Sequence, residues 1–311
     1  MDRDAISFFR KFKTELLGRG ITTVFGFLII FITLAIAIFL IAKGISTFTT
    51  QGHSLSEFLF SDKFSPQEKV GATPGQVGSA IYIAGSILIS LFALIIATPF
   101  AVSSAIFMNE ISPKLGKRLY RPAIEIFVGI PSVVYGWIGL TVLVPFLQDI
   151  FQLQTGQTVF AGSIVLALMI FPTITSVSTD AIRVVPHEYK EAAYSLGCTR
   201  WQMIWKVQLP AALSGIFTGI VLGLARAFGE ALAVAMVIGN SDRFPKFQNG
   251  FIDGLLSSTH NLTSKIASMM GDTVNGSEAN DALWTMALLL FVISFIFILI
   301  IRILGRKGEK A

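Results

Sequence analysis

A charged pair interrupts a long apolar stretch of the sequence. Arg226 and Glu230 lie four residues apart in the run RAFGE, within the apolar segment 210–239. A charge inside a membrane span is costly and usually faces protein or water. The planar N–H donors of Arg226 suit phosphate-like oxygens, and Glu230 could hold the guanidinium in place and compete with a bound anion. The same spacing also allows an intrahelical ion pair, and the two roles are compatible.

Three glycines precede this pair at intervals of four residues. Small side chains at that spacing let a second helix approach closely, so we expect Gly215, Gly219 and Gly223 to form a packing ridge. At about 100° per residue, Arg226 falls within about 20° of Gly215, and Glu230 within about 20° of Gly219. The glycines and the charges are therefore predicted to share one helix face, which cannot be pure lipid contact.

A polar segment, 188–210, separates two apolar runs and is patterned. Good helix formers fill its first part, Gly197 can end that helix with a positive φ, and Pro210 suits the first turn of the next helix. Two small alanines let another surface approach closely. The residues of this pattern are Glu188, Glu191, Ala192, Ala193, Gly197, Leu209 and Pro210.

The order EAA, glycine, hydrophobic residue and LP resembles the coupling loop of ABC importer permeases. Val207 stands where that family usually has Ile. The resemblance implies a short cytoplasmic helix that docks into a groove on a separate ATPase subunit, with the seven pattern residues forming the ATPase-coupling site. The alternative is an ordinary amphipathic connector between membrane helices.

No motif for enzyme chemistry on this chain is found. The sequence lacks GxxxxGK[ST], the run whose backbone N–H groups wrap phosphates, so any ATP and Mg²⁺ must bind to a partner ATPase. No HExxH occurs, and the three histidines are far apart. The single cysteine, Cys198, excludes an intrachain disulfide. We therefore expect a transport subunit with no catalytic residues, metal site or cofactor of its own.

Composition indicates an integral membrane protein. Of the 311 residues, 53% are hydrophobic and 14% are charged, and the mean hydropathy is +0.71. The net charge of +5 could suggest a nucleic-acid partner. However, the basic residues gather at the ends of apolar spans, which favours a membrane-lipid environment and no nucleic acid.

The apolar runs predict an all-α polytopic protein with six membrane helices. A basic segment, 1–20, precedes the first helix, 21–42, which is too long for the core of a cleaved signal peptide. The connection 43–76 contains enough apolar residues for a short surface helix. The permease core, 77–303, holds spans near 77–108, 122–147, 160–182, 210–239 and 283–303, the coupling loop 183–209, and a following tail, 304–311. We expect kinks at Pro131, Pro145 and Pro172.

The basic residues also predict the orientation. With the N-terminus inside, the cytoplasmic segments hold 17 Lys and Arg, the outer segments hold six, and Arg226 lies within a span. This bias places both termini and the coupling loop on the cytoplasmic side. The resemblance to ABC importer permeases implies that the membrane is the cell (inner) membrane of a bacterium or archaeon. Two other acidic residues near span ends, Glu125 and Asp180, are expected to pair with Arg121 and Arg183.

Two further stretches extend the resemblance. RAFGEALAVAMVIGN and GIPSVVYGWIGL, residues 129–140, resemble the permease subunits of high-affinity phosphate importers, and PstC more than PstA. The resemblance implies a MetI-like fold and a heterodimer with a PstA-like permease. It further implies two PstB-like ATPase subunits and an external PstS-like phosphate-binding protein. In that family the Arg and Glu of RAxGE are linked to phosphate passage, and they correspond to Arg226 and Glu230; Ala231 stands where the family often has Thr.

The sequence thus predicts the permease subunit of an ATP-driven phosphate importer. Another oxyanion, such as phosphonate, sulfate or molybdate, is the close alternative, because Arg226 does not discriminate among these anions. A secondary transporter or channel that works without ATP is the alternative of another class, and it leaves the EAA–Gly–LP pattern unexplained. A membrane-embedded enzyme would need a nucleophile or metal set that the sequence lacks.

Overall fold

Six helical segments are long and apolar enough to cross a membrane. The computed structural model describes residues 17–67, 75–247 and 250–308. Within them the spans are Gly18–Thr49, Ala80–Ile111, Ser132–Phe151, Val159–Val184, Arg200–Gly229 and Glu278–Ile303. The prediction of an all-α protein with about six membrane helices is confirmed. Most of the basic segment 1–20 and the last three residues of the tail lie outside the described residues.

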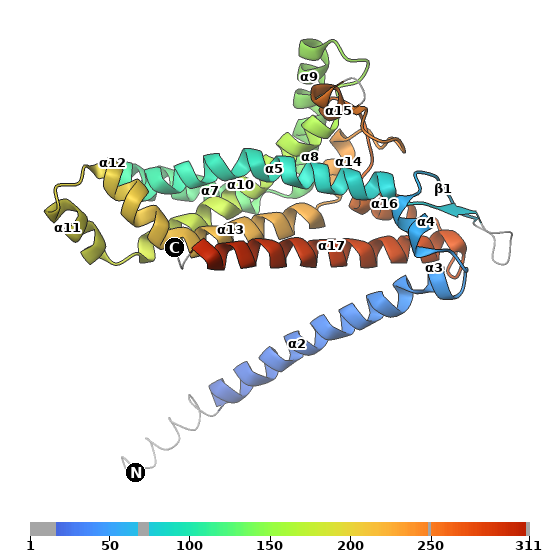
Figure 1. Ribbon diagram of the computed structural model, residues 1–311, viewed down its shortest axis with the longest axis horizontal. Helices are drawn as coiled ribbons and strands as arrows, with labels where there is room; N and C mark the ends of the chain where they lie inside the picture. The colour runs from blue at the N-terminus through green and yellow to red at the C-terminus, as the bar shows by residue number, and fades with distance from the viewer. Residues whose placement is uncertain (1–16, 68–74, 248–249, 309–311) are drawn as a thin grey trace, which may run out of the picture.

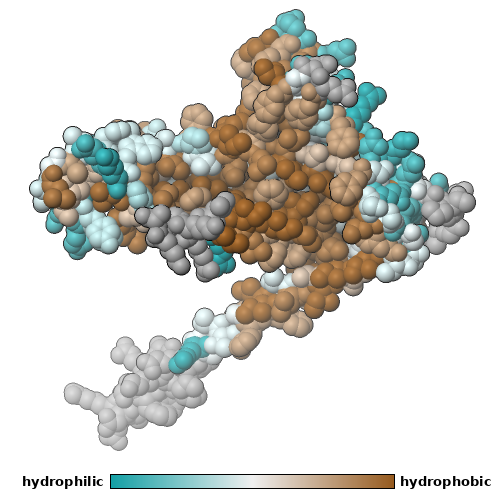
Figure 2. Space-filling model, in the orientation of Figure 1, coloured by the Kyte–Doolittle hydropathy of each residue, from teal (hydrophilic) through white to brown (hydrophobic). Residues whose placement is uncertain are grey.

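Four long helices form the body of the molecule (Figure 1). Helix α10 (Val159–Val184) contacts α5 (Ala80–Ile106) and α13 (Leu209–Gly229), and α13 contacts α17 (Glu278–Gly308). A core cluster between α5, α10 and α13 includes Ile89, Leu166, Ile170, Ile174 and Ala227. Apolar side chains also cover much of the visible outer surface, while hydrophilic ones gather at its extremities (Figure 2). This distribution fits a bundle whose sides face lipid.

Helix α2 (Leu17–Gly44) diverges from this bundle (Figure 1). It contacts α17, and the ring of Phe39 meets Trp284 edge to face with centroids 5.3 Å apart. None of the residues in its most apolar window is buried, whereas 67% of the corresponding window in α10 is buried. Helix α2 therefore contributes little to the core of this chain.

Short elements close the end of the bundle where α2 joins it, called here the hairpin end. They are α3 (Ser46–Thr49), α4 (Leu55–Phe60), strands β1 (Phe64–Ser65) and β2 (Gln76–Val77), and α16 (Leu262–Met269). The strands are antiparallel, with Phe64 opposite Val77. Phe58, Tyr82 and Leu262 pack together beneath them. The connection 43–76 thus has its surface helix, and it adds a two-stranded sheet that its sequence did not predict.

The third predicted span, 122–147, is broken. Helix α7 (Arg121–Gly129) ends before Pro131, and α8 (Ser132–Ile138), the π-helical turn η4 (Gly139–Leu143) and α9 (Val144–Phe151) follow. Pro131 has no N–H to donate to the carbonyl of Phe127. The hydroxyl of Tyr135 donates to that carbonyl instead, at 2.9 Å. Pro131 therefore causes a full break, with the candidate span running from Ser132 to Phe151.

The fifth predicted span, 210–239, also has different limits. It begins earlier, with α12 (Arg200–Met203) and the π-helical turn η5 (Ile204–Gln208) leading directly into α13. Pro210 lies in the first turn of α13, as expected, although the helical run that contains it begins earlier, at Arg200. The π turn just before it is a place where a proline's missing hydrogen bond and bulky ring can be accommodated. The span then ends at Gly229, and a separate short helix, α14 (Leu232–Val237), follows.

The opposite end of the molecule is called here the α11 end. It is formed by α11 (His187–Ser195) with α12, which extend beyond the bundle (Figure 1). Nearby, the connection 109–121 is almost entirely helical, with η2 (Phe107–Ile111), α6 (Pro113–Leu115) and η3 (Gly116–Tyr120). A last short helix, α15 (Phe251–Leu255), contacts α10, and the ring of its Phe251 lies 5.6 Å from that of Phe92 on α5.

Candidate functional site

The three ridge glycines of α13 face α10. A Cβ atom added at Gly223 would lie 2.6 Å from the side chain of Ile174, and one at Gly219 would lie 3.2 Å from Val177. Gly215 meets Ala181 in the same way. Because a larger side chain at Gly215 or Gly223 would collide with α10, the spacing brings the two backbones together.

Arg226 follows this ridge on α13 and is half-buried. Its Nη1 donates to the hydroxyl of Thr173 on α10, at 3.1 Å. A guanidinium carries several N–H donors, and within the described residues this is the one hydrogen bond that the Arg226 side chain makes. The remaining donors are therefore free to bind an anion.

Glu230 lies outside the helix that carries Arg226. Its backbone is extended, with φ −80° and ψ 121°, because α13 ends at Gly229. Its Oε1 accepts from the N–H of Ala233 at 3.2 Å, in the first turn of α14. Its carbonyl accepts from the hydroxyl of Thr263, at 2.9 Å.

The ion pair allowed by the spacing of Arg226 and Glu230 is not formed. Among the described residues, no salt bridge within 4.0 Å joins these two side chains. An i,i+4 pair requires both residues in one helix, and the helix stops between them. The predicted shared face therefore holds for the glycines and Arg226, which all face α10, but does not extend to Glu230.

The two broken spans meet beside this region. Helix α8 packs on α14 so closely that a Cβ atom at Gly136 would lie 2.8 Å from the Cα of Ala233. Tyr135 and Glu230 thus flank one contact between discontinuous helices. Membrane transporters commonly bind substrates at such interruptions, where backbone groups are released from helical pairing. Sequence reasoning missed Thr173, Tyr135 and Thr263; the first two are hydroxyls in apolar runs, a weak signal, and nothing links Thr263 to Glu230 in the sequence.

The helix predicted to end at Gly197 does end there. Gly197 has φ +76°. Its N–H donates to the carbonyl of Tyr194, and the N–H of Cys198 donates to the carbonyl of Ala193. These two bonds form a Schellman motif, the common way to end a helix with glycine in the left-handed region. The expected conformation of Gly197 is confirmed.

The surface around this helix exposes large apolar side chains. Glu188, Glu191, Ala192, Gly197 and Pro210 are exposed, whereas Ala193 and Leu209 are buried. Leu196 is 85% exposed. Contiguous apolar exposure of this kind marks an interaction site. We name it the α11 surface, and its large exposed side chains are Val184, Tyr189, Tyr194, Leu196, Trp201 and Trp205. The EAA pattern located this surface, but not its aromatic residues.

The predicted acidic–basic pairs near span ends are both present. The carboxylate of Glu125 accepts from the Nε of Arg121 at 3.1 Å, and Asp180 lies 3.8 Å from Arg183. All four side chains are exposed. Exposed pairs of this kind contribute little to stability, roughly 0–1 kcal/mol.

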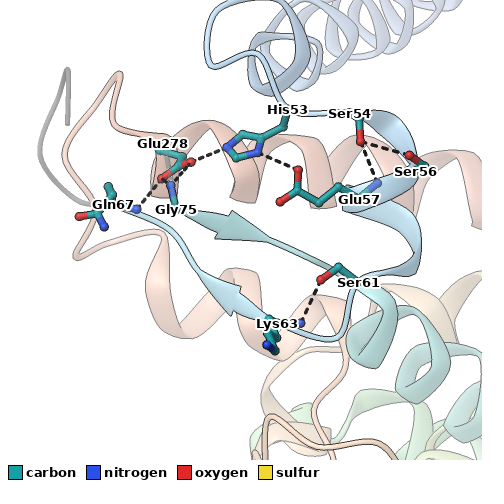
Figure 3. A network of polar contacts seen from close by, with 9 residues as sticks. All are labelled: His53, Ser54, Ser56, Glu57, Ser61, Lys63, Gln67, Gly75 and Glu278. Carbon is teal, nitrogen blue, oxygen red and sulfur yellow. Dashed lines mark hydrogen bonds and ion pairs between the residues drawn. The ribbon is translucent and has the colours of Figure 1, made fainter. Parts of the chain in front are cut away.

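Charged side chains at the hairpin end pair with one another. His53 lies between Glu57 and Glu278 (Figure 3). The carboxylate of Glu278 also accepts from the backbone N–H of Gln67 at 2.6 Å and of Gly75 at 2.8 Å. Burial opposes protonation of His53, but the hydrogen bonds and charges of the two carboxylates outweigh it and hold the His53 pKa above its ordinary value.

A second network at this end surrounds Asp242. Its carboxylate accepts from Lys265 and contacts the Nδ1 of His260, each at 2.9 Å. Burial raises the pKa of Asp242, but these two partners and the Tyr82 hydroxyl outweigh it and hold that pKa well below its ordinary value. Within the described residues, no group of three or more His, Cys, Asp and Glu side chains is arranged to hold a metal ion.

Comparisons with known proteins give one consistent result. Residues 97–310 match the family described as binding-protein-dependent transport system inner membrane component. The chain is 46% identical over 298 residues to the probable ABC transporter permease protein YqgH of Bacillus subtilis, covering 95% of this chain and 92% of that protein. It is 34% identical over 315 residues to the phosphate transport system permease protein PstC of Pasteurella multocida, covering 95% and 93%.

A solved structure has a similar fold. It is the crystal structure of a bacterial alginate ABC transporter in complex with an alginate pentasaccharide-bound periplasmic protein. One of its chains matches with a TM-score of 0.62 at 15% identity, covering 97% of this chain and 98% of that one. The likeness therefore shows a shared fold over nearly the whole chain.

Proposed function

Because the chain belongs to the family of binding-protein-dependent transport system inner membrane components, we propose that it is the permease subunit of an ATP-driven phosphate importer. It forms half of the translocation path and hydrolyses no ATP itself. The half-buried Arg226 with its free N–H donors is the structural observation that carries the choice of an anion. The similarity to PstC of Pasteurella multocida supports phosphate among the anions.

The partners follow from the surfaces that this chain leaves exposed. The α11 surface suits a groove on an ABC ATPase, whose PstB-like subunits supply ATP and Mg²⁺. A PstA-like permease forms the second half of the path, and a PstS-like protein delivers phosphate at the hairpin end. The distribution of Lys and Arg supports an orientation with the α11 end and both termini in the cytoplasm.

The helices suggest how ATP binding moves the path. Closure of the ATPase pushes α11, and the turn at Gly197 joins α11 to the unbroken run of α12, η5 and α13. Arg226 lies near the far end of α13, beside the interruption at Glu230. Movement of α13 against α10 would change the access to Arg226 from the outer face to the inner face. Binding in the path stays weak because Glu230 repels an anion held by Arg226.

The test is phosphate uptake by proteoliposomes that contain the complete transporter: this chain, the partner permease, the ATPase and the binding protein. Uptake that requires ATP and is reduced at least about tenfold by Arg226→Gln supports the proposal, since an anion loses its guanidinium partner. Thr218→Val, which removes an exposed hydroxyl from the same helix, is the matched control and retains uptake.

Other outcomes separate the alternatives. ATP-dependent uptake of sulfate, molybdate or a phosphonate with phosphate ignored would keep the importer and replace its substrate. Phosphate uptake by this chain alone, without ATP, would identify a secondary transporter or channel. Normal phosphate uptake by Arg226→Gln would show that Arg226 does not bind phosphate in the translocation path.

A further inference from the structure

A buried carboxylate lies directly behind the α11 surface. Glu110 belongs to η2, which continues α5, and it is only 9% exposed. Its Oε1 accepts from the Nζ of Lys190 on α11 at 2.6 Å and from the Nε2 of Gln208 in η5 at 2.6 Å. One carboxylate oxygen therefore joins three elements that are distant in the sequence.

The contact is costly to disrupt. A buried charge that loses its partner is left without solvation. Lys190 has only 20% of its side chain exposed, and Gln208 is 1% exposed. Neither donor can turn freely to water when Glu110 is removed. The three side chains, named here the Glu110 junction, thus form a buried polar contact between α11, η2 and η5.

Other contacts of α11 with the bundle are few. Ala193 is the one residue of α11 that is buried, where it packs among Ala105, Met203 and Ile204. The remaining residues of α11 are exposed, apart from Lys190, which is intermediate. The short side chain of Ala193 gives van der Waals contact but no directional bond. Lys190 is therefore the residue through which α11 is fixed to η2 in a defined direction.

The junction also reaches the helix that carries Arg226. Gln208 immediately precedes Leu209, the first residue of α13. Asn109, next to Glu110, donates to the carbonyl of Thr179 on α10, at 2.9 Å. Hydrogen bonds thus connect α11 to η2, which continues α5, and from there to α10 and to the start of α13.

We propose that the Glu110 junction transmits the movement of the docked ATPase from α11 to the membrane helices, with Glu110 as the positioning residue. This inference rests on the proposed function, because it requires an ATPase at the α11 surface. It assigns to Glu110 a role in coupling that is separate from docking, since Glu110 is too buried to touch another subunit. Its loss is expected to let α11 move while the bundle lags behind.

The experiment measures phosphate moved per ATP hydrolysed in proteoliposomes holding the complete transporter. Lys190→Met and Glu110→Ala are each expected to lower this ratio about tenfold, the size of a typical coupling free energy, while ATPase binding to the complex persists. Glu125→Ala is the matched control, because Glu125 also pairs with a cation, Arg121, but is 66% exposed. A ratio unchanged in Lys190→Met would overturn the proposal.

A charge exchange distinguishes transmission from simple stabilisation. In the double variant Glu110→Lys with Lys190→Glu, the new ammonium can donate both to the new carboxylate and to the Oε1 of Gln208, which is buried without a partner. We expect the ratio to recover toward wild type. If the amount of assembled complex recovers but the ratio does not, the junction stabilises without transmitting. If the wild-type transporter moves no phosphate with ATP, the proposed function fails first.

Discussion

Glu278, at the hairpin end, is 4% exposed, whereas Leu196, at the α11 end, is 85% exposed. The carboxylate of Glu278 contacts His53 and two backbone N–H groups of the same chain (Figure 3). Lys265 is likewise buried against Asp242, with its Nζ 5.1 Å from the ring centres of Phe64 and of Tyr82. At the hairpin end, the buried charged side chains are thus paired with other groups of the same chain.

The α11 end exposes large apolar side chains that no residue of this chain covers among the described residues. The indoles of Trp201 and Trp205 meet at 5.7 Å, yet each is more than half exposed. Exposed apolar side chains of this size are stabilised when a partner covers them. The Glu110 junction is the one buried charge contact that α11 makes among the described residues. The contrast indicates that the hairpin end is built to hold its shape alone, and the α11 end to be completed by another subunit.

The strongest test of this contrast places aspartate at one glycine of positive φ at each end. Gly197 has φ +76° and Gly52 has φ +78°, and a Cβ atom at either position meets open space. Aspartate costs about 1–2 kcal/mol of backbone strain at each. We expect Gly197→Asp to reduce ATP-driven uptake at least about tenfold, because strain at Gly197 changes the direction in which α11 ends and misplaces it against the ATPase. Gly52→Asp should insert and transport normally; equal loss in both variants would contradict the docking role of the α11 surface.

The next effect concerns stability at the hairpin end. Glu278→Ala leaves the N–H groups of Gln67 and Gly75 without their acceptor, and it removes one of the two carboxylates that contact His53. We expect the local opening free energy to fall by roughly 3 kcal/mol. Hydrogen exchange of the amides in β1 and β2 measures it. Glu125→Ala, which breaks an exposed pair, should change protection near α7 by less than about 1 kcal/mol; similar losses in the two variants would contradict the contrast between buried and exposed charges.

The sequence could predict what depends on local pattern. Hydropathy located six spans, and Gly197 marked the end of α11 because few residues other than glycine adopt a positive φ there. The spacing of Gly215, Gly219 and Gly223 predicted a close helix contact, and the structure places it against α10. Each of these predictions depends on residues within a few turns of one another.

What the sequence could not predict depends on distant partners. Nothing local stops α13 at Gly229. The side chain of Glu230 accepts from the N–H of Ala233 in α14, and its carbonyl accepts from Thr263, which is 33 residues away. Glu110 is an acidic residue in a connection rich in Lys and Arg, and nothing in the neighbouring sequence singles it out. Its partners, Lys190 and Gln208, are 80 and 98 residues away. Such contacts appear only when the helices are packed.

The smallest predicted effect is a pH dependence confined to the hairpin end. The pKa of His53 is held above its ordinary value by Glu278 and Glu57, against the effect of burial. The charged form of His53 therefore adds stability that is complete below its unfolded pKa of about 6.5 and is lost as pH rises through the higher folded pKa. Compared with His53→Gln at each pH, the wild-type protein should show extra protection of the amides in α4 that declines with rising pH from about pH 6 upward.

His187 provides the control for this measurement. It also contacts a carboxylate, that of Glu191 at 3.1 Å, but its side chain is 77% exposed. Solvent screens an exposed pair, so His187→Gln should leave hydrogen exchange at both ends unchanged between pH 6 and 8. A pH-dependent change in α11 as large as that in α4 would show that burial is not what distinguishes the two ends. A pH dependence seen in α4 alone would show that charges within this chain stabilise the hairpin end. The α11 end would then depend on its partner subunit for stabilisation.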